Sequence, residues 1–392
     1  MSGNKTSMKI LWLNPWFGNY RVPVYRYLKE YSNDNFYLIY GSYSLSESLC
    51  NKLEQTLGDK AIAIDNSKRI VIGSEKSDMA NGCIRIPISS GVYGEIKKIK
   101  PDVIIVDGFF QWAPIAMAYC KIHGIPMIID YERTCHVERN SPKWRTFYRK
   151  MFGKLVKGFV VNGSLTVDYL KYLGLGNKVI VPGAMAADSY GLKSSVLAVT
   201  EDEKSKLKNS LNLKHGLIYI FVGQLVERKG VAEMLQAWKE HQQSYQEDNL
   251  LILGKGVLHE ELKSIIEKNK LNVHLLGQIP YDEIAPYYAI SDVMVMPTLE
   301  DNWSLVVPEG MACGLPILCS IYNGGYPELV HEGENGFTFD PLSQSSFVRA
   351  LNSMHESDLD SMGAKSIEIE SGFTPDKAAA NILKCCKIIT HN

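Results

Sequence analysis

The sequence has no apolar run that approaches the ~18 residues needed for a membrane-spanning helix. It begins MSGNKTSMKILWLNPWFGNY, which is a strand-length apolar run followed by turn residues rather than a signal peptide. An excess of one charge is also missing: the formal net charge is −1, so no basic field points to nucleic acid. We therefore expect a cytoplasmic protein that binds no nucleic acid, with contact to a membrane surface left open.

Cysteine is sparse and lacks the spacing of a metal site. The eight cysteines are scattered, and Cys385 and Cys386 are adjacent, which suits neither a framework disulfide nor zinc. This usage is typical of a reducing compartment. With 392 residues, of which 45% are hydrophobic, the chain is too long for one typical domain and can build two cores.

Apolar runs alternate with helical patterns along the first half of the chain. Helix-like segments such as WAPIAMAYCKIHG and SLTVDYLKYLG separate the runs. The alternation predicts a parallel sheet that is covered on both faces. The predicted strands are at 8–13, 102–107, 126–130, 158–161 and 178–181.

The pattern fades over 185–215, which is polar, charged and expected to be partly helical, and then begins again. The fold class is therefore α/β, with two doubly wound parallel-sheet domains and a ligand cleft at the carboxyl ends of both sheets. The segment PDKAAANILKCCKII predicts a terminal helix. The later strands are predicted at 217–223, 249–254, 272–277, 292–297 and 316–320, and the domain boundaries at 1–190, 191–372 and 373–392.

One segment, LEDNWSLVVPEGMACGLP, places acids at both ends of an apolar stretch, just after a predicted strand of the second sheet. Pro308 fits only the first turn of a helix, so the helix is expected to begin near Ser304 or Leu305, with Ser304 as the N-cap. Such a helix start attracts an anion. Glu309 would then suit a pair of ribose hydroxyls, and Asp301 the hydroxyls of a sugar attached to the anion.

A second junction of strand and helix carries cations. The segment FVGQLVERKGV is a buried strand, a glycine turn and the start of a helix, with Arg228 and Lys229 at its mouth. A diphosphate leaving group needs its developing charge neutralised, and cations beside a helix start can do this without a metal.

Six segments in a consistent order resemble the family 4 retaining glycosyltransferases, which have the GT-B fold, and the resemblance covers nearly the whole chain. It implies a hexosyl-type enzyme that moves a sugar from a nucleoside diphosphate sugar, with UDP the expected nucleotide, to a saccharide or lipid-linked acceptor. It also implies retention of configuration, no metal or other cofactor, a role in polysaccharide or lipopolysaccharide biosynthesis, and a C-terminal helix that crosses back to the first domain. The segments are KPDVIIVDGFF, GIPMIIDYERT, VGQLVERKG, LGKGVLHEEL, DNWSLVVPEGMACGLPIL and NGGYPELVHEGENGFTFDP.

The resemblance implies that Glu309 binds the donor ribose, Lys229 with Arg228 the diphosphate, and Asp301 the transferred sugar. Two positions depart from the family pattern: Asp301 stands where glutamate is usual, and Gln224 where arginine is usual. The implied catalytic residues are Lys229, Arg228, Asp301 and Glu132. The implied donor contacts are Gly223, Gln224, Lys229, Gly254, Lys255, Asp301, Asn302, Trp303, Ser304, Leu305 and Glu309.

The acceptor is expected in the first domain. Glu132, in DYERT, follows a predicted strand and is a candidate acceptor contact or base. Gly18 and Arg21 belong to the first strand-to-helix loop, which would line the acceptor site, approach the donor phosphate, or form an ordinary glycine turn.

The segment 141–159 combines aromatic residues at helical spacing with six Lys or Arg residues. Such a helix can lie on an anionic bilayer. The family resemblance favours this interpretation, because acceptors of these enzymes are often lipid-linked. The alternative is a core helix whose apolar face packs on its own sheet while its cations are solvated. A peripheral position at the inner face of the plasma membrane is the localisation that the first alternative implies.

Other functions stay open at this point. A nucleotide-sugar epimerase of the same fold, or a non-catalytic nucleotide-sugar-binding partner in an assembly complex, would share much of the pattern. An NAD enzyme is disfavoured because GKGVLH lacks the third glycine and the ribose-binding acid. Asp358 and Asp360 imitate a metal-binding Asp-x-Asp, but we interpret them as a solvated face. Four glycines are expected to be turn residues with positive φ: Gly324, Gly325, Gly333 and Gly336.

Overall fold

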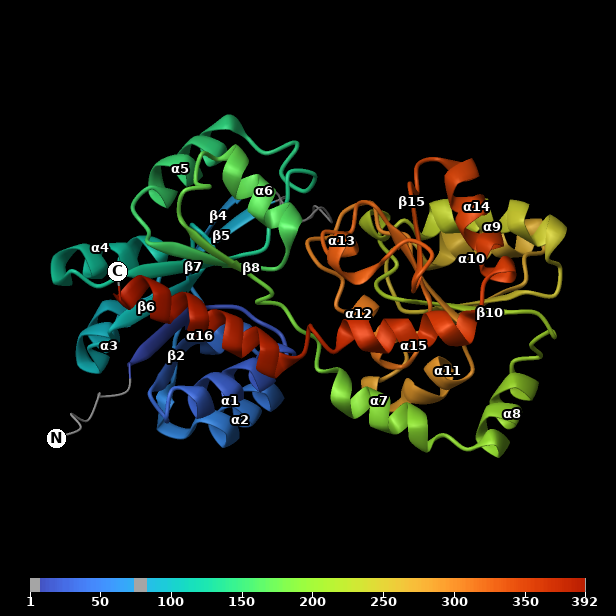
Figure 1. Ribbon diagram of the computed structural model, residues 1–392, viewed down its shortest axis with the longest axis horizontal. Coiled ribbons are helices and arrows are strands. Elements are labelled where there is room, and N and C mark those ends of the chain that lie inside the picture. Colours follow the sequence, from blue (N-terminus) through green and yellow to red (C-terminus); the bar gives the residue numbers. More distant parts are fainter. Residues whose placement is uncertain (1–7, 74–82, 392) are drawn as a thin grey trace. The chain divides into compact units, whose positions relative to one another are not determined.

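The computed structural model describes residues 8–73 and 83–391, which divide into two compact units (Figure 1). Unit 1 comprises 8–73, 83–186 and 374–391, and unit 2 is Ala187–Phe373. The sequence-based boundary was 190/191, and the division lies at 186/187. The C-terminal helix belongs to unit 1, although it follows unit 2 in the chain.

Unit 1 contains a seven-stranded parallel sheet in the order β3-β2-β1-β6-β7-β8-β9. All five predicted strands of this half are present. Sequence reasoning missed β2 and β3, and β3 is a half-exposed edge strand of only four residues. The strands are β1 Ile10–Asn14, β2 Phe36–Gly41, β3 Ala61–Ile64, β6 Val103–Asp107, β7 Met127–Tyr131, β8 Gly158–Val161 and β9 Val179–Pro182.

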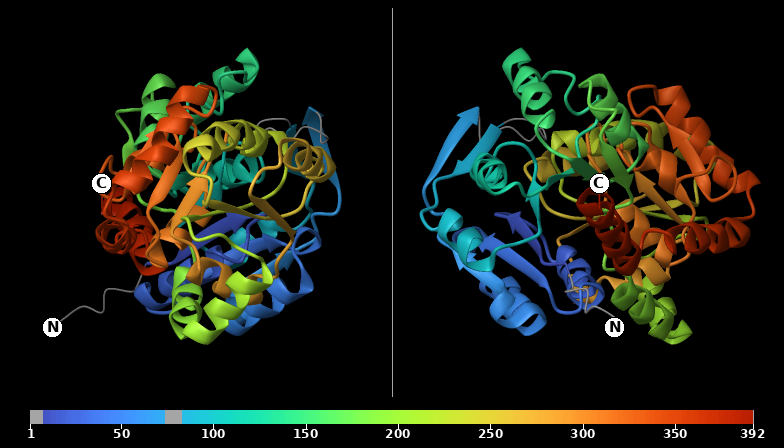
Figure 2. Two further views of the ribbon diagram at one scale, coloured as in Figure 1. Left: turned by 90° about the vertical axis from the view of Figure 1, so that its right-hand side faces the viewer. Right: turned by 60° about the vertical axis from the view of Figure 1, so that its left-hand side comes forward.

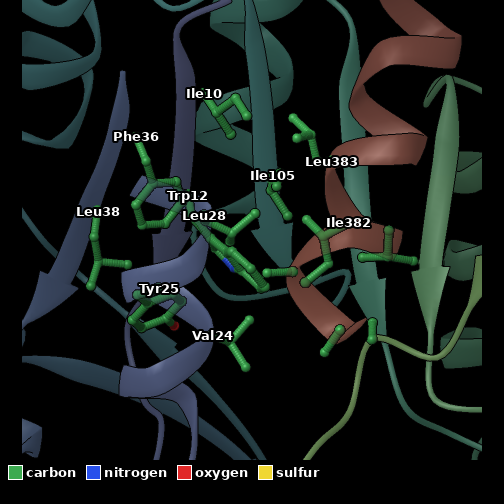
Figure 3. Close-up of a cluster of buried hydrophobic side chains, with 14 of the residues drawn as sticks. Ile10, Trp12, Val24, Tyr25, Leu28, Phe36, Leu38, Ile105, Ile382 and Leu383 are labelled. Carbon is green, nitrogen blue, oxygen red and sulfur yellow. The ribbon is translucent and has the colours of Figure 1, made fainter. Parts of the chain in front are cut away.

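Helices cover both faces of this sheet. Figure 3 shows one of the two cores, in which Tyr25 and Leu28 of α1 gather with Ile382 of α16 around Trp12 and Ile105. The helix α16 thereby completes unit 1 from the far end of the sequence. The helices are α1 Arg21–Tyr31, α2 Glu47–Leu57, α3 Val92–Ile99, α4 Ala113–His123, α5 Lys143–Gly153, α6 Ser164–Tyr172 and α16 Pro375–His391, with short η1 Ser42–Ser44 and η2 Gly58–Lys60.

An antiparallel hairpin, β4 Arg69–Gly73 with β5 Cys83–Pro87, forms a separate small sheet of unit 1 (Figure 2). Strand β4 is exposed along its whole length. Sequence reasoning missed this hairpin, whose two strands are only five residues long each.

Helix α5 turns its arginines inward, and the expectation that its cations are solvated is wrong for Arg145 and Arg149. The guanidinium of Arg149 donates to both carboxylate oxygens of Glu138, at 2.6 and 3.0 Å, and to the hydroxyl of Tyr169 at 3.1 Å. Arg145 donates to the carbonyl of Ile72 in β4 at 3.4 Å. With these arginines buried, the opposite face of α5 carries apolar side chains into solvent.

Unit 2 contains a six-stranded parallel sheet in the order β12-β11-β10-β13-β14-β15. The five predicted strands are present, and only the short edge strand β15 was missed. The strands are β10 Ile218–Val222, β11 Asn249–Leu253, β12 Val273–Gly277, β13 Val293–Met296, β14 Ile317–Ser320 and β15 Gly336–Phe339. The helices are α7 Ser189–Ala198, α8 Glu201–Ser210, η3 Glu227–Lys229, α9 Val231–Ser244, α10 His259–Asn269, η4 Tyr281–Glu283, α11 Ala285–Ala289, α12 Val306–Ala312, α13 Tyr326–Leu329, α14 Gln344–Ser353, η5 Met354–Glu356 and α15 Leu359–Glu370.

Two smaller expectations have different outcomes. Asp358 caps α15 by accepting from the backbone N–H of Ser361, and Asp360 is exposed, so the Asp-x-Asp is a solvated helix start as predicted. Of the four predicted turn glycines, only Gly333 has positive φ, and Gly325 has φ −98°. Within 8–73 and 83–391, no helix is both long and apolar enough to cross a membrane.

Candidate functional site

The strand order of unit 2 explains where its polar residues meet. Strand β10 pairs in parallel with β11 on one side and with β13 on the other. The strands before β13 are therefore added on one side of β10, and those from β13 onward are added on the other side. Loops that follow the two strands at such a switch point diverge at the carboxyl edge and leave a crevice there. Lys229 follows β10 and Asp301 follows β13, so residues 72 positions apart come together at this edge.

Backbone hydrogen bonds fasten the turn η3 to the loop after β13. The carbonyl of Arg228 accepts from the N–H of Leu299 at 2.8 Å and from the hydroxyl of Thr298 at 2.9 Å. Gly230 ends the turn with φ +66°, and a Cβ there would lie 2.1 Å from the carbonyl oxygen of Pro297. Only glycine allows this approach, which brings the Lys229 ammonium to the neighbouring loop.

The carboxylate of Asp301 is bound by groups of its own unit. Its Oδ2 accepts from Lys229 Nζ at 2.6 Å and from the Ser304 hydroxyl at 2.8 Å, and its Oδ1 accepts from the Trp303 N–H at 3.1 Å. Burial opposes the charge, but Lys229, Ser304 and Arg228 together hold the pKa of Asp301 below its ordinary value. Asp301 is therefore an ionised counter-ion that fixes Lys229.

The helix start differs from the prediction. Helix α12 begins at Val306, and Ser304 does not cap it, because the Ser304 hydroxyl donates to Asp301 and its N–H donates to Asn323 Oδ1 at 3.3 Å. Pro308 lies in the first turn, as proline requires.

Glu309 lies one turn into α12, and its hydrogen-bond partner is not a member of the Asp301 cluster. Tyr281 donates its hydroxyl to Glu309 Oε1 at 3.4 Å. Burial, with a smaller contribution from the nearby Asp188, raises the pKa of Glu309 to about 7, although the hydrogen bond from Tyr281 lowers it. The carboxyl group is thus poised to change charge near neutral pH.

A cavity of ≈ 850 Å³ opens at the same edge of unit 2, lined by the loops that follow β10, β11 and β12. Four of the predicted donor contacts line it: Gly223, Gln224, Gly254 and Lys255. Gly254 has φ +157°, and a Cβ there would lie 1.7 Å from the Gly223 carbonyl oxygen, so the two loops touch through bare backbone. Gln224 accepts from Arg228 at 3.3 Å, which ties this wall to the turn that holds Lys229.

The three remaining donor candidates differ in exposure. Trp303 is buried and packs on Phe373, so its ring belongs to the core of unit 2. Leu305 is half-buried. The side-chain oxygen of Asn302 is buried and has no hydrogen-bond partner within unit 2. A buried acceptor without a partner is costly, so Asn302 is suited to receive a donor group from a ligand.

In unit 1, the predicted acceptor residues meet around one guanidinium. Arg21 is the first residue of α1 and follows the loop that contains Gly18. Its side chain is 2% exposed, and it donates to Asp130 Oδ2 at 2.7 Å and to Glu132 Oε1 at 3.0 Å. The Glu132 side chain is 28% exposed. Arg21 thus orients Glu132, and Glu132 is the member of this pair that a ligand can reach.

Two aspartates of this cluster were missed by sequence reasoning. Asp107 and Asp130 lie at opposed positions of β6 and β7 near the carboxyl edge. Burial raises the pKa of Asp130 to about 7, against the attraction of Arg21, and burial together with Asp130 and Glu132 raises the pKa of Asp107 well above its ordinary value. The available signal was an aspartate at the end of two buried strands, DVIIVD and PMIID.

Part of the chain is similar in sequence to known proteins. Residues 202–367 match the family model described as glycosyl transferases group 1. The chain is 24% identical over 266 residues to alpha-monoglucosyldiacylglycerol synthase of Acholeplasma laidlawii, covering 63% of this chain and 65% of that protein. It is also 24% identical over 281 residues to the sulfoquinovosyl transferase SQD2 of Arabidopsis thaliana, covering 69% of this chain and 53% of that protein. The chain therefore spans less than two thirds of the length of these two relatives.

Among solved structures, Alr3699/HepE of Anabaena in complex with UDP superimposes with a TM-score of 0.74. The superposition covers 97% of this chain and 100% of that chain at 16% identity, and it shows a shared fold. The architecture is GT-B, with two Rossmann-like parallel-sheet units and a helical C-terminus. Over residues 202–367, which are less than half of its length, the chain is thus similar to the glycosyl transferases group 1 family.

Proposed function

We propose that the protein is a glycosyltransferase that moves a hexosyl group from a nucleoside diphosphate sugar to a saccharide or lipid-linked saccharide. The proposed nucleotide of the donor is UDP. The observation that carries the proposal is the Lys229–Asp301 pair at the carboxyl edge of unit 2, tied through Arg228 and Gln224 to the wall of the cavity. A fixed ammonium beside a cavity is the arrangement that a diphosphate leaving group requires.

In the proposed reaction, the bond between the anomeric carbon and the donor phosphate oxygen breaks while a bond to the acceptor hydroxyl oxygen forms on the same face. The acceptor proton passes to the leaving phosphate, so configuration is retained and a nucleoside diphosphate is released. The ammonium of Lys229 has three donors. One contacts Asp301, and the others stabilise the charge that develops on the phosphate.

The donor base and ribose are assigned to the cavity wall and to Glu309. The backbone of Gly223 and Gly254 lets a planar base approach closely, and Lys255 lies on the same wall. Glu309 accepts from a ribose diol when it is ionised. In this assignment, Asn302 offers its unpaired oxygen to the transferred sugar.

The acceptor is assigned to unit 1. Glu132 contacts the acceptor hydroxyl, whose proton passes to the leaving phosphate, and Arg21, which is itself paired with Asp130, holds Glu132 in place. Gly18 belongs to the loop that leads into this cluster, since its carbonyl accepts from the Arg21 N–H at 3.1 Å.

A peripheral position at the inner face of the plasma membrane is the finer part of the proposal. Helix α5 and the residues just after it expose an apolar stripe of four side chains, and four lysines lie in the same segment. Figure 1 shows α5 as an outer helix of unit 1. Apolar groups flanked by cations suit an anionic bilayer, which would also present a lipid-linked acceptor. The stripe is Trp144, Phe147, Met151 and Leu155, and the lysines are Lys143, Lys150, Lys154 and Lys157.

The test is binding followed by turnover. Thermal unfolding is measured with UDP, GDP, ADP and NAD, for the wild type and for Lys229→Ala and Glu309→Ala. One nucleoside diphosphate at ~100 times its dissociation constant should add ~2.7 kcal/mol of stability to the wild type, and both variants should lose the effect. Mass spectrometry of acceptor mixtures with the matching sugar nucleotide then detects the product, and NMR of its anomeric proton reports retention. Binding without transfer or donor hydrolysis would favour a non-catalytic partner, and a changed donor sugar would favour an epimerase.

A further inference from the structure

Two histidines and an aspartate of unit 2 converge on one point, away from the residues assigned to sugar transfer. His241 lies in the last turn of α9, Asp248 immediately precedes β11, and His355 lies in η5. The Nε2 atoms of His241 and His355 lie 2.9 and 2.6 Å from the same oxygen, Asp248 Oδ2. One nitrogen or oxygen atom from each residue lies within 4.8 Å of those of the other two.

The other side of each group is fixed by a neighbour. His241 Nδ1 lies 2.7 Å from Asn352 Oδ1, and Asp248 Oδ1 accepts from the N–H of Leu217 at 2.9 Å. The ring of His355 stacks on Tyr245, with centroids 3.7 Å apart and planes 7° apart. Partners of this kind hold metal-binding histidines and carboxylates in their tautomer and orientation.

Hydrogen counting at His241 points to a cation. Asn352 is oriented with its side-chain oxygen at Nδ1, and in this orientation Nδ1 carries the ring hydrogen and donates it. In neutral imidazole, Nε2 then presents a lone pair, and the atom 2.9 Å away is a carboxylate oxygen that also presents lone pairs. Two acceptors at this distance repel unless a positive charge lies with them, either a second proton on the ring or a metal ion.

The donor set and its burial favour a metal ion. The side chains of His241 and Asp248 are 0% and 2% exposed, whereas that of His355 is 23% exposed, which leaves one side open for an ion and a water molecule to enter. Two imidazole nitrogens, one carboxylate oxygen and a water form the tetrahedral set that zinc accepts. Magnesium and calcium require mainly oxygen ligands and do not suit this set.

We propose that His241, Asp248 and His355 bind a zinc ion. Zinc bonds of ~2.0–2.2 Å place tetrahedral ligand atoms about 3.3 Å apart, so the two histidines move back from Asp248 by less than about 1 Å on binding. His355 makes this movement from the short η5 turn at the surface.

The ion would be structural. Asp248 precedes β11, so the triad lies at the amino ends of the strands, whereas Lys229 and Asp301 lie at the carboxyl ends. Zinc would join α9, β11 and η5, and 107 residues separate Asp248 from His355. A link over this length restricts the unfolded chain and therefore stabilises unit 2. The proposed zinc ion takes no part in sugar transfer.

The test uses the full chain after removal of metals with a chelator. Calorimetric titration with Zn²⁺ should show one ion per chain, and zinc at ~100 times its dissociation constant should raise Tm by about 5–10 °C. Mg²⁺ should give neither effect. His355→Gln should abolish zinc binding, whereas His215→Gln, which changes an exposed histidine of the same unit, should bind as the wild type does.

Cobalt provides a readout that needs no variant. Co²⁺ added to the stripped wild type should develop the visible absorption of a four-coordinate ion, and Zn²⁺ should displace it. The proposal is wrong if Zn²⁺ leaves Tm and the injection heats of the wild type unchanged, because a second ring proton then supplies the charge. It is equally wrong if His355→Gln folds and binds zinc as tightly as the wild type.

Discussion

Lys229 Nζ lies 2.6 Å from Asp301 Oδ2, and this contact joins the loops that follow β10 and β13. The two side chains are 12% and 14% exposed. Asp301 keeps the ammonium at the mouth of the strand-to-helix turn, and Lys229 keeps the half-buried carboxylate ionised. The pair thus has both a structural and a functional consequence, which can be separated experimentally.

Replacing Lys229 by methionine should remove nucleoside diphosphate binding and lower the stability of the apo protein by up to about 3 kcal/mol, because Asp301 loses its main counter-ion. The double variant Lys229→Met with Asp301→Asn should be destabilised by less than the sum of the single changes, since no charge is left unpaired. Urea unfolding and the UDP-induced thermal shift measure the two effects. Lys239→Met, an exposed lysine on α9, is the control and should match the wild type in both. Additive stability changes would argue against coupling.

Ten of the thirteen strands of the two parallel sheets could be predicted from the sequence because buried parallel strands are short apolar runs, and the runs at 102–107 and 249–254 are such cases. The hairpin β4–β5 could not, because β4 is exposed along its whole length and β5 is only five residues long. The residue types of the candidate site were also readable. The hydrogen bonds that Asp301 accepts from Lys229, Ser304 and Trp303 could not be predicted. The contact with Lys229 depends on the strand order that places β10 beside β13.

The orientation of α5 illustrates the same limit. Arginine and aromatic residues alternate around this helix, so the pattern alone allows either face to be buried. The contact of Arg149 with Glu138 and Tyr169 decides which face packs inward, and these partners lie 11 and 20 residues away. Similarly, Arg21 was predicted as a ligand contact from its loop, whereas its burial depends on Asp130, 109 residues away.

Glu309→Gln should stabilise the apo protein increasingly as pH rises. The folded-state pKa of about 7 lies above the ordinary value of 4.5, so the unfolded chain loses this proton first. The destabilisation of the wild type by the buried, ionised Glu309 is absent below pH ~4.5, grows between pH ~4.5 and ~7, and is constant above pH ~7. It amounts to at most about 1.4 kcal/mol per pH unit of that window. The Tm difference between variant and wild type, measured from pH 4.5 to 8, should follow this course.

The matched control for this experiment is Glu267→Gln on α10, an exposed glutamate. Its Tm difference from the wild type should not rise over the same pH range. A Tm difference for Glu309→Gln that is constant with pH would show that Glu309 does not change its charge between the folded and unfolded states.

Arg21→Met should destabilise the protein by about 3–5 kcal/mol at pH 8, because it leaves Asp130 and Glu132 without their cation in a cluster that also contains Asp107. The loss should shrink toward pH 5, since the carboxyl groups can take up protons once the guanidinium is gone. Urea unfolding at both pH values measures this. Arg26→Met, an exposed arginine on the same helix, should change stability by less than about 0.5 kcal/mol. If Arg21→Met is as stable as the wild type at pH 8, Asp130 is already protonated and needs no counter-ion.

Phe147→Glu should weaken binding to anionic vesicles by about tenfold or more, because it removes the most exposed member of the α5 stripe, at 66% exposure, and adds a repelled charge. Lys154→Glu should also weaken binding to phosphatidylglycerol-containing vesicles, and its effect should fade at high salt, whereas the Phe147 effect should persist. Co-sedimentation with vesicles of phosphatidylcholine, alone or with phosphatidylglycerol, measures both. Leu197→Glu, a 77% exposed leucine on α7 in unit 2, is the matched control and should bind as the wild type does. If the wild type stays in the supernatant with both kinds of vesicle, or if the α5 variants sediment as it does, the stripe is not a membrane contact and the acceptor must be delivered to unit 1 in another way.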